Sequence, residues 1–308
     1  MKNVRFNKNI TFDELVEAWL NNKKPHLRTS SFFIYKRMVS LQILPYFSNK
    51  KVKLIDHEDI QKYVDHIYDQ IQMNYFSFRY GSNILSIFKS IMNYYEPFVI
   101  SHDKQIAFAK KRDTRCFSKK EAKIIIDACL ENINYKKLGI LIALFTGIRI
   151  GELCALKWQD INFKSKIIHI HKTIQRIHED STSYIHISSP KTFSSIRKIP
   201  ICDLLLKVMN EMKAKDEYYV LSNRPTPIEP RNYRHFYDAF NKSLSINKIN
   251  FHGLRHTFAS MCIEAGIDFK TVSELLGHSS IAITMNTYVH LSFDHKKKCL
   301  EKLVKFIG

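Results

Sequence analysis

Four side chains in the last fifth of the sequence are of types that could act together on one anion: His252, Arg255, His278 and Tyr288. His252 and Arg255 are three residues apart, which places both on one side of the first turn of a helix. A guanidinium and imidazoles can bind a phosphate, and a phenol can attack it as a nucleophile. Because single residues of these types are usually structural, the hypothesis rests on the ordered set.

The elements that must position these four groups can be predicted from the residues around them. A helical pattern follows a turn at 252–253. Gly277 is expected to end the next helix and to leave His278 at an exposed corner. A serine after His278 is then expected to cap a short helix that carries Tyr288.

An upstream segment, 143–153, contains a second candidate arginine and reads ALFTGIRIGEL. Gly147 is expected to end or bend the buried helix that precedes it, so that Arg149 emerges at a corner. Glu152, three residues further on, could then hold the guanidinium of Arg149. Lys191 follows in the segment PKTFSSIRKIP, where we expect a hairpin turn with a long, flexible cationic side chain.

The motifs H-x-L-R-H and L-L-G-H, a tyrosine ten residues after the second motif, the arginine segment and the P-K-T segment occur in that order. This chain resembles the tyrosine recombinases, the family of phage and conjugative-transposon integrases and of bacterial chromosome-dimer-resolving recombinases. The resemblance implies that the nucleophile is Tyr288 and that Glu152 supports the site. The other catalytic residues that it implies are Arg149, Lys191, His252, Arg255 and His278.

The resemblance also implies a reaction. Tyr288 would attack the scissile phosphate to give a 3'-phosphotyrosine and a free 5'-hydroxyl, and the partner strand would then displace it. Lys191 would protonate the 5' oxygen, His252 would assist proton transfer at the tyrosine, and His278 would donate to the phosphate. Because the enzyme link stores the energy of the phosphoester bond, no nucleotide cofactor or metal is expected.

The composition agrees with a nucleic-acid partner. The 48 Lys and Arg residues outnumber the 29 Asp and Glu residues, a formal net charge of +19, and the excess is spread over the chain. Such a charge favours a polyanion. The six cysteines contain no C-x-x-C pair, which favours reduced core residues over disulfides or zinc ligands. With neither a signal peptide nor a membrane span in the sequence, a cytoplasmic protein with no membrane partner is expected.

The fold is predicted to be mainly α with a small antiparallel β-sheet, the α+β class. We expect a helical core-binding domain at 1–96, a basic linker at 97–116 and a catalytic domain at 117–308. The residues expected to cap helices are Thr11, Asp56, Ser118 and Asp203. The segments expected to be extended are 43–47, 219–222 and three strands near 167–174, 184–187 and 195–201.

The resemblance implies double-stranded DNA recombination sites as the partner, and a homo-tetramer that assembles on DNA and exchanges its C-terminal helices. A directionality factor and a host DNA-bending protein are further partners that it suggests. Integrases often carry an N-terminal arm-binding domain, and only ten residues precede Thr11, so we expect either a natural arm-less enzyme or a shortened one.

Integration and excision of a mobile element is the preferred role. A dimer-resolving recombinase or a DNA invertase is the first alternative. A type IB topoisomerase shares the site and mechanism but needs no tetramer. A DNA-binding regulator without catalysis is a third reading, which an intact set of site residues disfavours.

Overall fold

The computed structural model describes residues 6–7, 9–96, 115–179, 182–190, 193–288 and 301. The chain divides into two compact units, one built mainly from residues 1–112 and the other mainly from residues 113–308. Most of the predicted linker, 97–114, lies outside the described residues.

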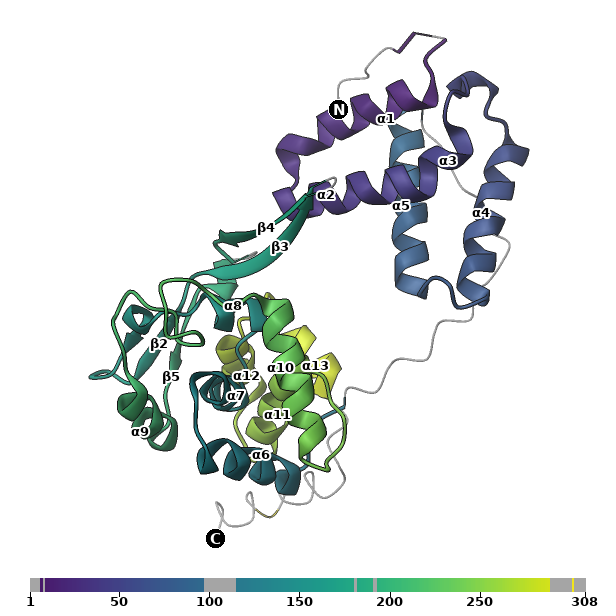
Figure 1. Ribbon diagram of the computed structural model, residues 1–308. Helices are drawn as coiled ribbons and strands as arrows, with labels where there is room; N and C mark the ends of the chain where they lie inside the picture. The colour runs from purple at the N-terminus through teal and green to yellow at the C-terminus, as the bar shows by residue number, and fades with distance from the viewer. Residues whose placement is uncertain are drawn as a thin grey trace. The chain divides into compact units, whose positions relative to one another are not determined.

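The N-terminal unit is helical (Figure 1). Its elements are α1 (Phe12–Lys23), η1 (Lys24–His26), α2 (Thr29–Met38), the π-helical η2 (Val39–Ile43), α3 (Leu44–Phe47), η3 (Val52–Leu54), α4 (His57–Gln72) and α5 (Phe78–Tyr95). Thr11 begins α1 with a capping box, in which its hydroxyl accepts from the backbone N–H of Glu14 at 3.3 Å. Asp56 accepts from the backbone N–H of Asp59 and begins α4. Both predicted caps are confirmed.

The core of this unit contains aliphatic side chains and a cluster of aromatic rings. Phe47, Tyr63 and Phe88 pack with ring centroids 4.9–5.2 Å apart, a spacing typical of favourable aromatic pairs. The expectation that 43–47 is extended is wrong, because this segment ends η2 and forms α3. Pro45 lies in the first turn of α3, where the absence of a backbone N–H costs nothing.

The C-terminal unit surrounds the buried helix α7 (Figure 1). Its helices are α6 (Lys119–Glu131), α7 (Tyr135–Thr146), α8 (Ile150–Ala155), η4 (Trp158–Asp160), η5 (Phe193–Ser195), α9 (Asp203–Met212), α10 (Pro230–Ser243), α11 (Phe251–Glu264), α12 (Phe269–Leu276) and α13 (Ile281–Tyr288). Ser118 caps α6 as predicted, and it does so in a capping box with Glu121. The apolar sequence of α7 is explained by its position, since α6, α9, α10 and α11 all pack against it.

The strands form two small sheets. They are β1 (Ile161–Asn162), β2 (Ile167–Ile170), β3 (Thr173–Glu179), β4 (Thr182–Ser188) and β5 (Arg197–Pro200). β2 is the centre of an antiparallel sheet β1-β2-β5, in which Ile168 pairs with Ile199, and β3 pairs with β4. The prediction that the strands on either side of Lys191 form a hairpin is wrong, because these strands, β4 and β5, belong to different sheets. Lys191 itself lies outside the described residues.

Two further local predictions are wrong for tertiary reasons. Asp203 does not cap α9, because it is the first helical residue and its carboxylate binds Lys166 Nζ at 2.6 Å. Residues 219–222 form a turn around an isolated bridge of Tyr219 and not a strand. The mainly helical fold with small antiparallel sheets is nevertheless confirmed. No helix among the described residues is long and apolar enough to cross a membrane.

Candidate active site

The arginine segment forms a corner after α7. Gly147 ends this helix with φ 63°, a left-handed conformation that suits glycine. A Cβ atom there would lie 2.6 Å from both Leu276 Cδ2 and Phe258 Cδ1, so the corner also has no space for a side chain. As predicted, the chain turns at Gly147 and brings Arg149 to the first position before α8.

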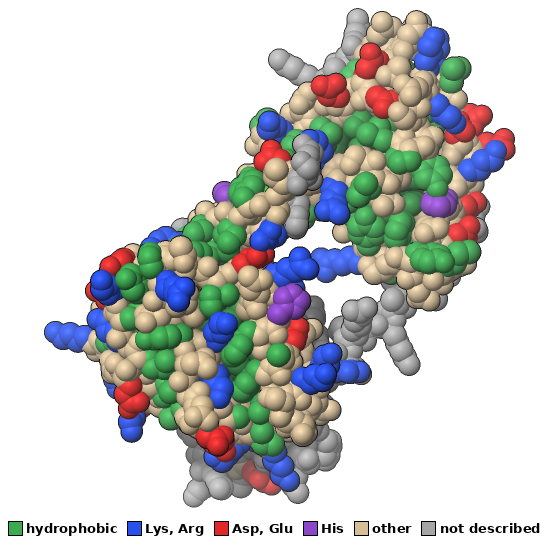
Figure 2. Space-filling view, in the orientation of Figure 1, with side chains coloured by type: hydrophobic (Ala, Val, Ile, Leu, Met, Phe, Trp, Pro, Cys, Tyr) green, Lys and Arg blue, Asp and Glu red, His purple; other side chains and the backbone are tan. Residues whose placement is uncertain are grey.

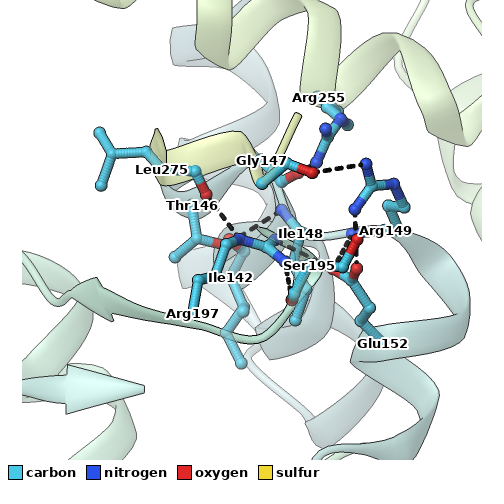
Figure 3. A network of polar contacts seen from close by, with 11 residues as sticks. Ile142, Thr146, Gly147, Ile148, Arg149, Glu152, Ser195, Arg197, Arg255 and Leu275 are labelled. Carbon is cyan, nitrogen blue, oxygen red and sulfur yellow. Dashed lines mark hydrogen bonds and ion pairs between the residues drawn. The ribbon is translucent and has the colours of Figure 1, made fainter. Parts of the chain in front are cut away.

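Glu152 holds Arg149 from inside this corner (Figure 3). Its carboxylate accepts from Arg149 Nη1 at 2.9 Å and from the Arg149 backbone N–H at 3.1 Å. The Glu152 side chain is 3% exposed, whereas that of Arg149 is 36% exposed. The buried carboxylate therefore fixes a guanidinium that solvent, or a ligand, can still reach.

Arg255 and His252 lie at the start of α11. Asn250 caps this helix by accepting from the Gly253 backbone N–H at 3.1 Å, so His252 belongs to the first helical turn rather than to a turn before the helix. Arg255 is buried, and its Nη1 donates to the carbonyl oxygen of Gly147 at 2.8 Å. The predicted placement of both residues in one helical turn is confirmed.

His278 follows the end of α12. Gly277 ends that helix with φ 67°, as predicted, and its carbonyl oxygen accepts from Arg149 Nη2 at 3.2 Å. His278 Nδ1 forms a hydrogen bond with the hydroxyl of Thr284 at 2.8 Å. Thr284 is fully buried on α13, the helix whose last residue is Tyr288. A hydrogen bond thus links the imidazole to the helix that carries the tyrosine. The side chain of Tyr288 itself lies outside the described part of the structure.

The arginines bind the carbonyl ends of helices, where the helix dipole is negative. Arg255 binds the end of α7 through Gly147, and Arg149 binds the end of α12 through Gly277. Each guanidinium is consequently aligned by a rigid element rather than by a loop alone. Two arginines thus connect helices from distant parts of the chain.

Arg197 is a member of this network that the sequence reasoning did not assign to the site. On β5, it donates from Nη2 to Glu152 at 2.9 Å, from Nε to the Leu275 carbonyl at 2.7 Å and from Nη1 to the Ser195 carbonyl at 3.1 Å. Its side chain is 5% exposed. Its place in the P-K-T segment was the available signal, but two of its three partners, Glu152 and Leu275, are distant in sequence.

Nearby charges and burial keep the carboxylate of Glu152 charged and the imidazoles of His252 and His278 neutral at pH 7. Burial raises the pKa of Glu152, but Arg197 and Arg149 outweigh it, so the pKa lies below the usual value. Burial and the charges of Arg255 and Arg149 lower the pKa of His278 to about 4. Partial desolvation and the same two arginines lower the pKa of His252. In the described part of the site, Arg149 and Arg197 bind the Glu152 carboxylate and Arg255 binds a backbone carbonyl, so three guanidiniums accompany one carboxylate and positive charge is left for an anion (Figure 3).

A third histidine, His256, lies next to His252. The ring of His256 contacts that of His252 edge to face, with centroids 4.6 Å apart. Burial, and then His252 and Arg255, lower its pKa to about 4. Within the described ranges, no cluster of three or more His, Cys, Asp or Glu residues has the geometry of a metal site.

Comparison with known proteins identifies the family. Residues 115–295 match the phage integrase family model, and residues 11–68 match a phage integrase N-terminal SAM-like domain. The chain therefore belongs to the phage integrase family of tyrosine recombinases, enzymes that cut and rejoin DNA. The resemblance noted in the sequence is confirmed.

The matches to relatives and to solved structures extend over nearly the whole chain. A tyrosine recombinase XerC-like protein of Caldanaerobacter subterraneus is 29% identical over 98% of this chain and 84% of the relative. The ICEBs1 integrase of Bacillus subtilis is 23% identical over 97% of this chain and 84% of the relative. The structure of the Tn1549 transposon integrase in complex with transposon right end DNA is similar, with a TM-score of 0.73 and 20% identity. The match covers 96% of this chain and 100% of the integrase chain in that structure. The structural likeness supports the fold.

Proposed function

We propose that the protein integrates and excises a mobile element by site-specific recombination through a 3'-phosphotyrosine intermediate. The position of Arg149 and Arg255 close to the same two histidines, His252 and His278, carries this proposal, because two guanidiniums can bind the non-bridging oxygens of a phosphate from two sides. Relatives named as phage, ICE and transposon integrases or transposases favour the mobile-element role over dimer resolution or DNA inversion.

In this proposal Arg149 and Arg255 stabilise the charge of the transition state, and Glu152 orients Arg149. Preorganised donors of this kind cost no rearrangement when the reaction occurs. His278 donates a hydrogen bond to the phosphate from the ring nitrogen that Thr284 does not bind. His252, whose lowered pKa leaves it neutral at pH 7, can accept the proton of the attacking phenol.

Tyr288 and Lys191 complete the chemistry. The phenolic oxygen forms a bond to phosphorus while the bond from phosphorus to the 5' oxygen breaks, and Lys191 gives a proton to that leaving oxygen. The 5'-hydroxyl of the partner strand then attacks phosphorus and releases the tyrosine. The number of phosphoester bonds is unchanged, so the reaction needs no nucleotide hydrolysis.

The assembly that we propose is a homo-tetramer on two double-stranded recombination sites. A core-binding domain at 1–96 and a catalytic domain at 117–308, joined by the basic segment 97–116, would hold the duplex. Lys and Arg side chains occur on the visible face of both units (Figure 2), and the whole sequence has 48 Lys and Arg residues against 29 Asp and Glu residues. Contacts to DNA phosphates should make binding steeply dependent on salt. The C-terminal segment would dock on a neighbouring subunit, and directionality and DNA-bending factors would act with the complex.

Strand exchange between two labelled duplexes that carry the junction sequences flanking the gene tests this function. A recombinase should yield duplexes with one end from each parent, and the recombinant bands should disappear with Tyr288→Phe. Relaxation of a supercoiled plasmid without recombinant bands would instead support a topoisomerase. Binding with neither reaction would support a DNA-binding regulator.

A further inference from the structure

We infer that Arg197 is a positioning residue for strand cleavage, one that locks the arginine corner, the end of α12 and the start of β5 into one arrangement. This inference rests on the proposed function, because it concerns how the same site is kept ready to bind the phosphate. Arg197 need not contact DNA for this role, since it would act through Glu152 and the carbonyl groups around it.

The three bonds of Arg197 point to three different segments. Its nitrogens bind the Glu152 carboxylate in α8, the Leu275 carbonyl in α12 and the Ser195 carbonyl just before β5 (Figure 3). These partners use Nη2, Nε and Nη1 respectively, so the planar fork of a guanidinium is required. A lysine has one nitrogen and could not satisfy all three acceptors in this geometry.

Arg197 also shapes the turn that follows α12. A Cβ atom added to Gly277 would lie 2.9 Å from Arg197 Cδ and 2.9 Å from the Ser194 carbonyl oxygen. The glycine therefore packs directly on Arg197, while its own carbonyl binds Arg149 at 3.2 Å. Moving Arg197 would loosen the same turn that presents His278 to the site.

The energetics favour positioning over stabilisation as the reason for this buried pair. Arg197 and Glu152 are 5% and 3% exposed, and the cost of removing two such charges from water commonly offsets their attraction. A fold that needed only stability at this place could use apolar residues. The Glu152 carboxylate is instead shared, with Oε1 binding the Arg149 guanidinium and Oε2 binding Arg197.

Variants Arg197→Met and Arg197→Lys test the inference on a nicked suicide duplex that traps the covalent intermediate. At temperatures well below each variant's melting point, we expect cleavage by Arg197→Met to fall about 100-fold, the scale of a small misplacement of reacting groups. DNA affinity should change by less than about 3-fold, because Arg197 is buried. Arg197→Lys should recover only part of the rate, since charge alone does not restore the three bonds.

Arg176→Met is the control for the loss of an arginine–glutamate ion pair elsewhere in the protein. Arg176 is 34% exposed and pairs with Glu229, another buried glutamate, and neither is a predicted site residue. We expect the control to lose thermal stability while it retains wild-type cleavage. If Arg197→Met and Arg176→Met cleave equally well once both are folded, Arg197 serves stability alone and the inference is overturned.

A titration of histidine ring signals by NMR provides a readout without catalysis. The pKa of His278 is lowered by burial and by nearby arginines that include Arg197. Removing the charge of Arg197 should by itself raise the His278 pKa in Arg197→Met, so Arg197→Lys, which keeps a positive charge, is the informative variant. We expect the His278 pKa to rise in Arg197→Lys as well, because the turn that buries the imidazole loosens, and to stay the same in Arg176→Met. An unchanged His278 pKa in Arg197→Lys would contradict the inference. Should the wild type bind DNA without forming an adduct, the proposed function fails, and the Arg197→Lys titration still tests whether Arg197 orders the turn at His278.

Discussion

The two units differ in what they bury. In the described part of the N-terminal unit, every buried side chain is hydrophobic, although Trp19 and Tyr63 still donate hydrogen bonds to Ser90 and Gln42. The C-terminal unit buries charged groups as well, among them Glu152, Arg197 and Arg255. Burying apolar surface stabilises a fold, whereas burying charge costs free energy unless every group is paired. Three of the five buried charged residues in the described part of the C-terminal unit belong to the candidate site, so that site accounts for much of the difference between the units.

The largest expected effect is on the apolar core of the N-terminal unit. Phe88→Ala should lower the free energy of unfolding of that unit by about 3–5 kcal/mol, because it removes a fully buried ring. The chain has two tryptophans, Trp19 in the first unit and Trp158 in the second, so fluorine NMR of fluorotryptophan-labelled protein can follow each unit separately. The denaturant midpoint of the Trp19 signal should fall while that of Trp158 stays. The exposed residue Ile34 offers a control, since Ile34→Ala should change neither signal.

Arg255→Lys should reduce cleavage by about 100- to 1000-fold, the usual cost of losing one preorganised donor. Lysine would keep the charge but lose the fork that binds the Gly147 carbonyl while facing the phosphate. The rate of adduct formation on a suicide duplex and the DNA affinity by fluorescence anisotropy should be measured together. Cleavage by Arg255→Lys at the wild-type rate would refute the proposal that Arg149 and Arg255 bind the phosphate from two sides.

Acid should destabilise the C-terminal unit first. The pKa values of His256 and His278 lie at about 4, below the ordinary value of 6.5, so the unfolded chain binds more protons between these pH values. Stability should therefore be complete above about pH 6.5 and decline as the pH falls towards 4. The effect should be moderate, because partly exposed rings are screened by solvent. The Trp158 midpoint should fall over this range and the Trp19 midpoint should not; a double variant with His256→Asn and His278→Asn should show a weaker decline.

The smallest expected effect concerns the link between His278 and α13. Thr284→Val removes the hydroxyl that bonds His278 Nδ1 and keeps the side-chain shape. We expect cleavage to slow by about 5- to 10-fold, equivalent to about one hydrogen bond. Thr271→Val, at an exposed position in α12, should leave the rate unchanged. A Thr284→Val rate equal to that of the wild type would mean that this bond does not position the imidazole.

Local features of the site could be predicted from the sequence because they depend on neighbouring residues. Gly147 and Gly277 end their helices in the left-handed conformation, and Glu152 binds Arg149 three residues away. Capping boxes at Thr11 and Ser118 likewise depend on partners three residues away. Such contacts follow from the geometry of a single helical turn.

The features that were missed or predicted wrongly depend on distant residues. Two of the three partners of Arg197 lie 45 and 78 residues away, and the carboxylate of Asp203 binds Lys166, 37 residues away, instead of capping α9. β5 pairs with β2, and β4 pairs with β3, so β4 and β5 do not form the expected hairpin. No local sequence pattern encodes this choice of partner strands. The assignment of Lys191 and Tyr288 to the chemistry stays a prediction.

Mapping the covalent bond between protein and DNA tests the role of Tyr288 most directly. The wild-type protein should be incubated with a nicked suicide duplex carrying the junction sequence, digested with protease and analysed by mass spectrometry. We predict one phosphorylated peptide, linked through Tyr288 to the 3' phosphate of the cleaved strand, and none with Tyr288→Phe. An adduct on another residue, or cleavage by Tyr288→Phe at the wild-type rate, would contradict the assignment.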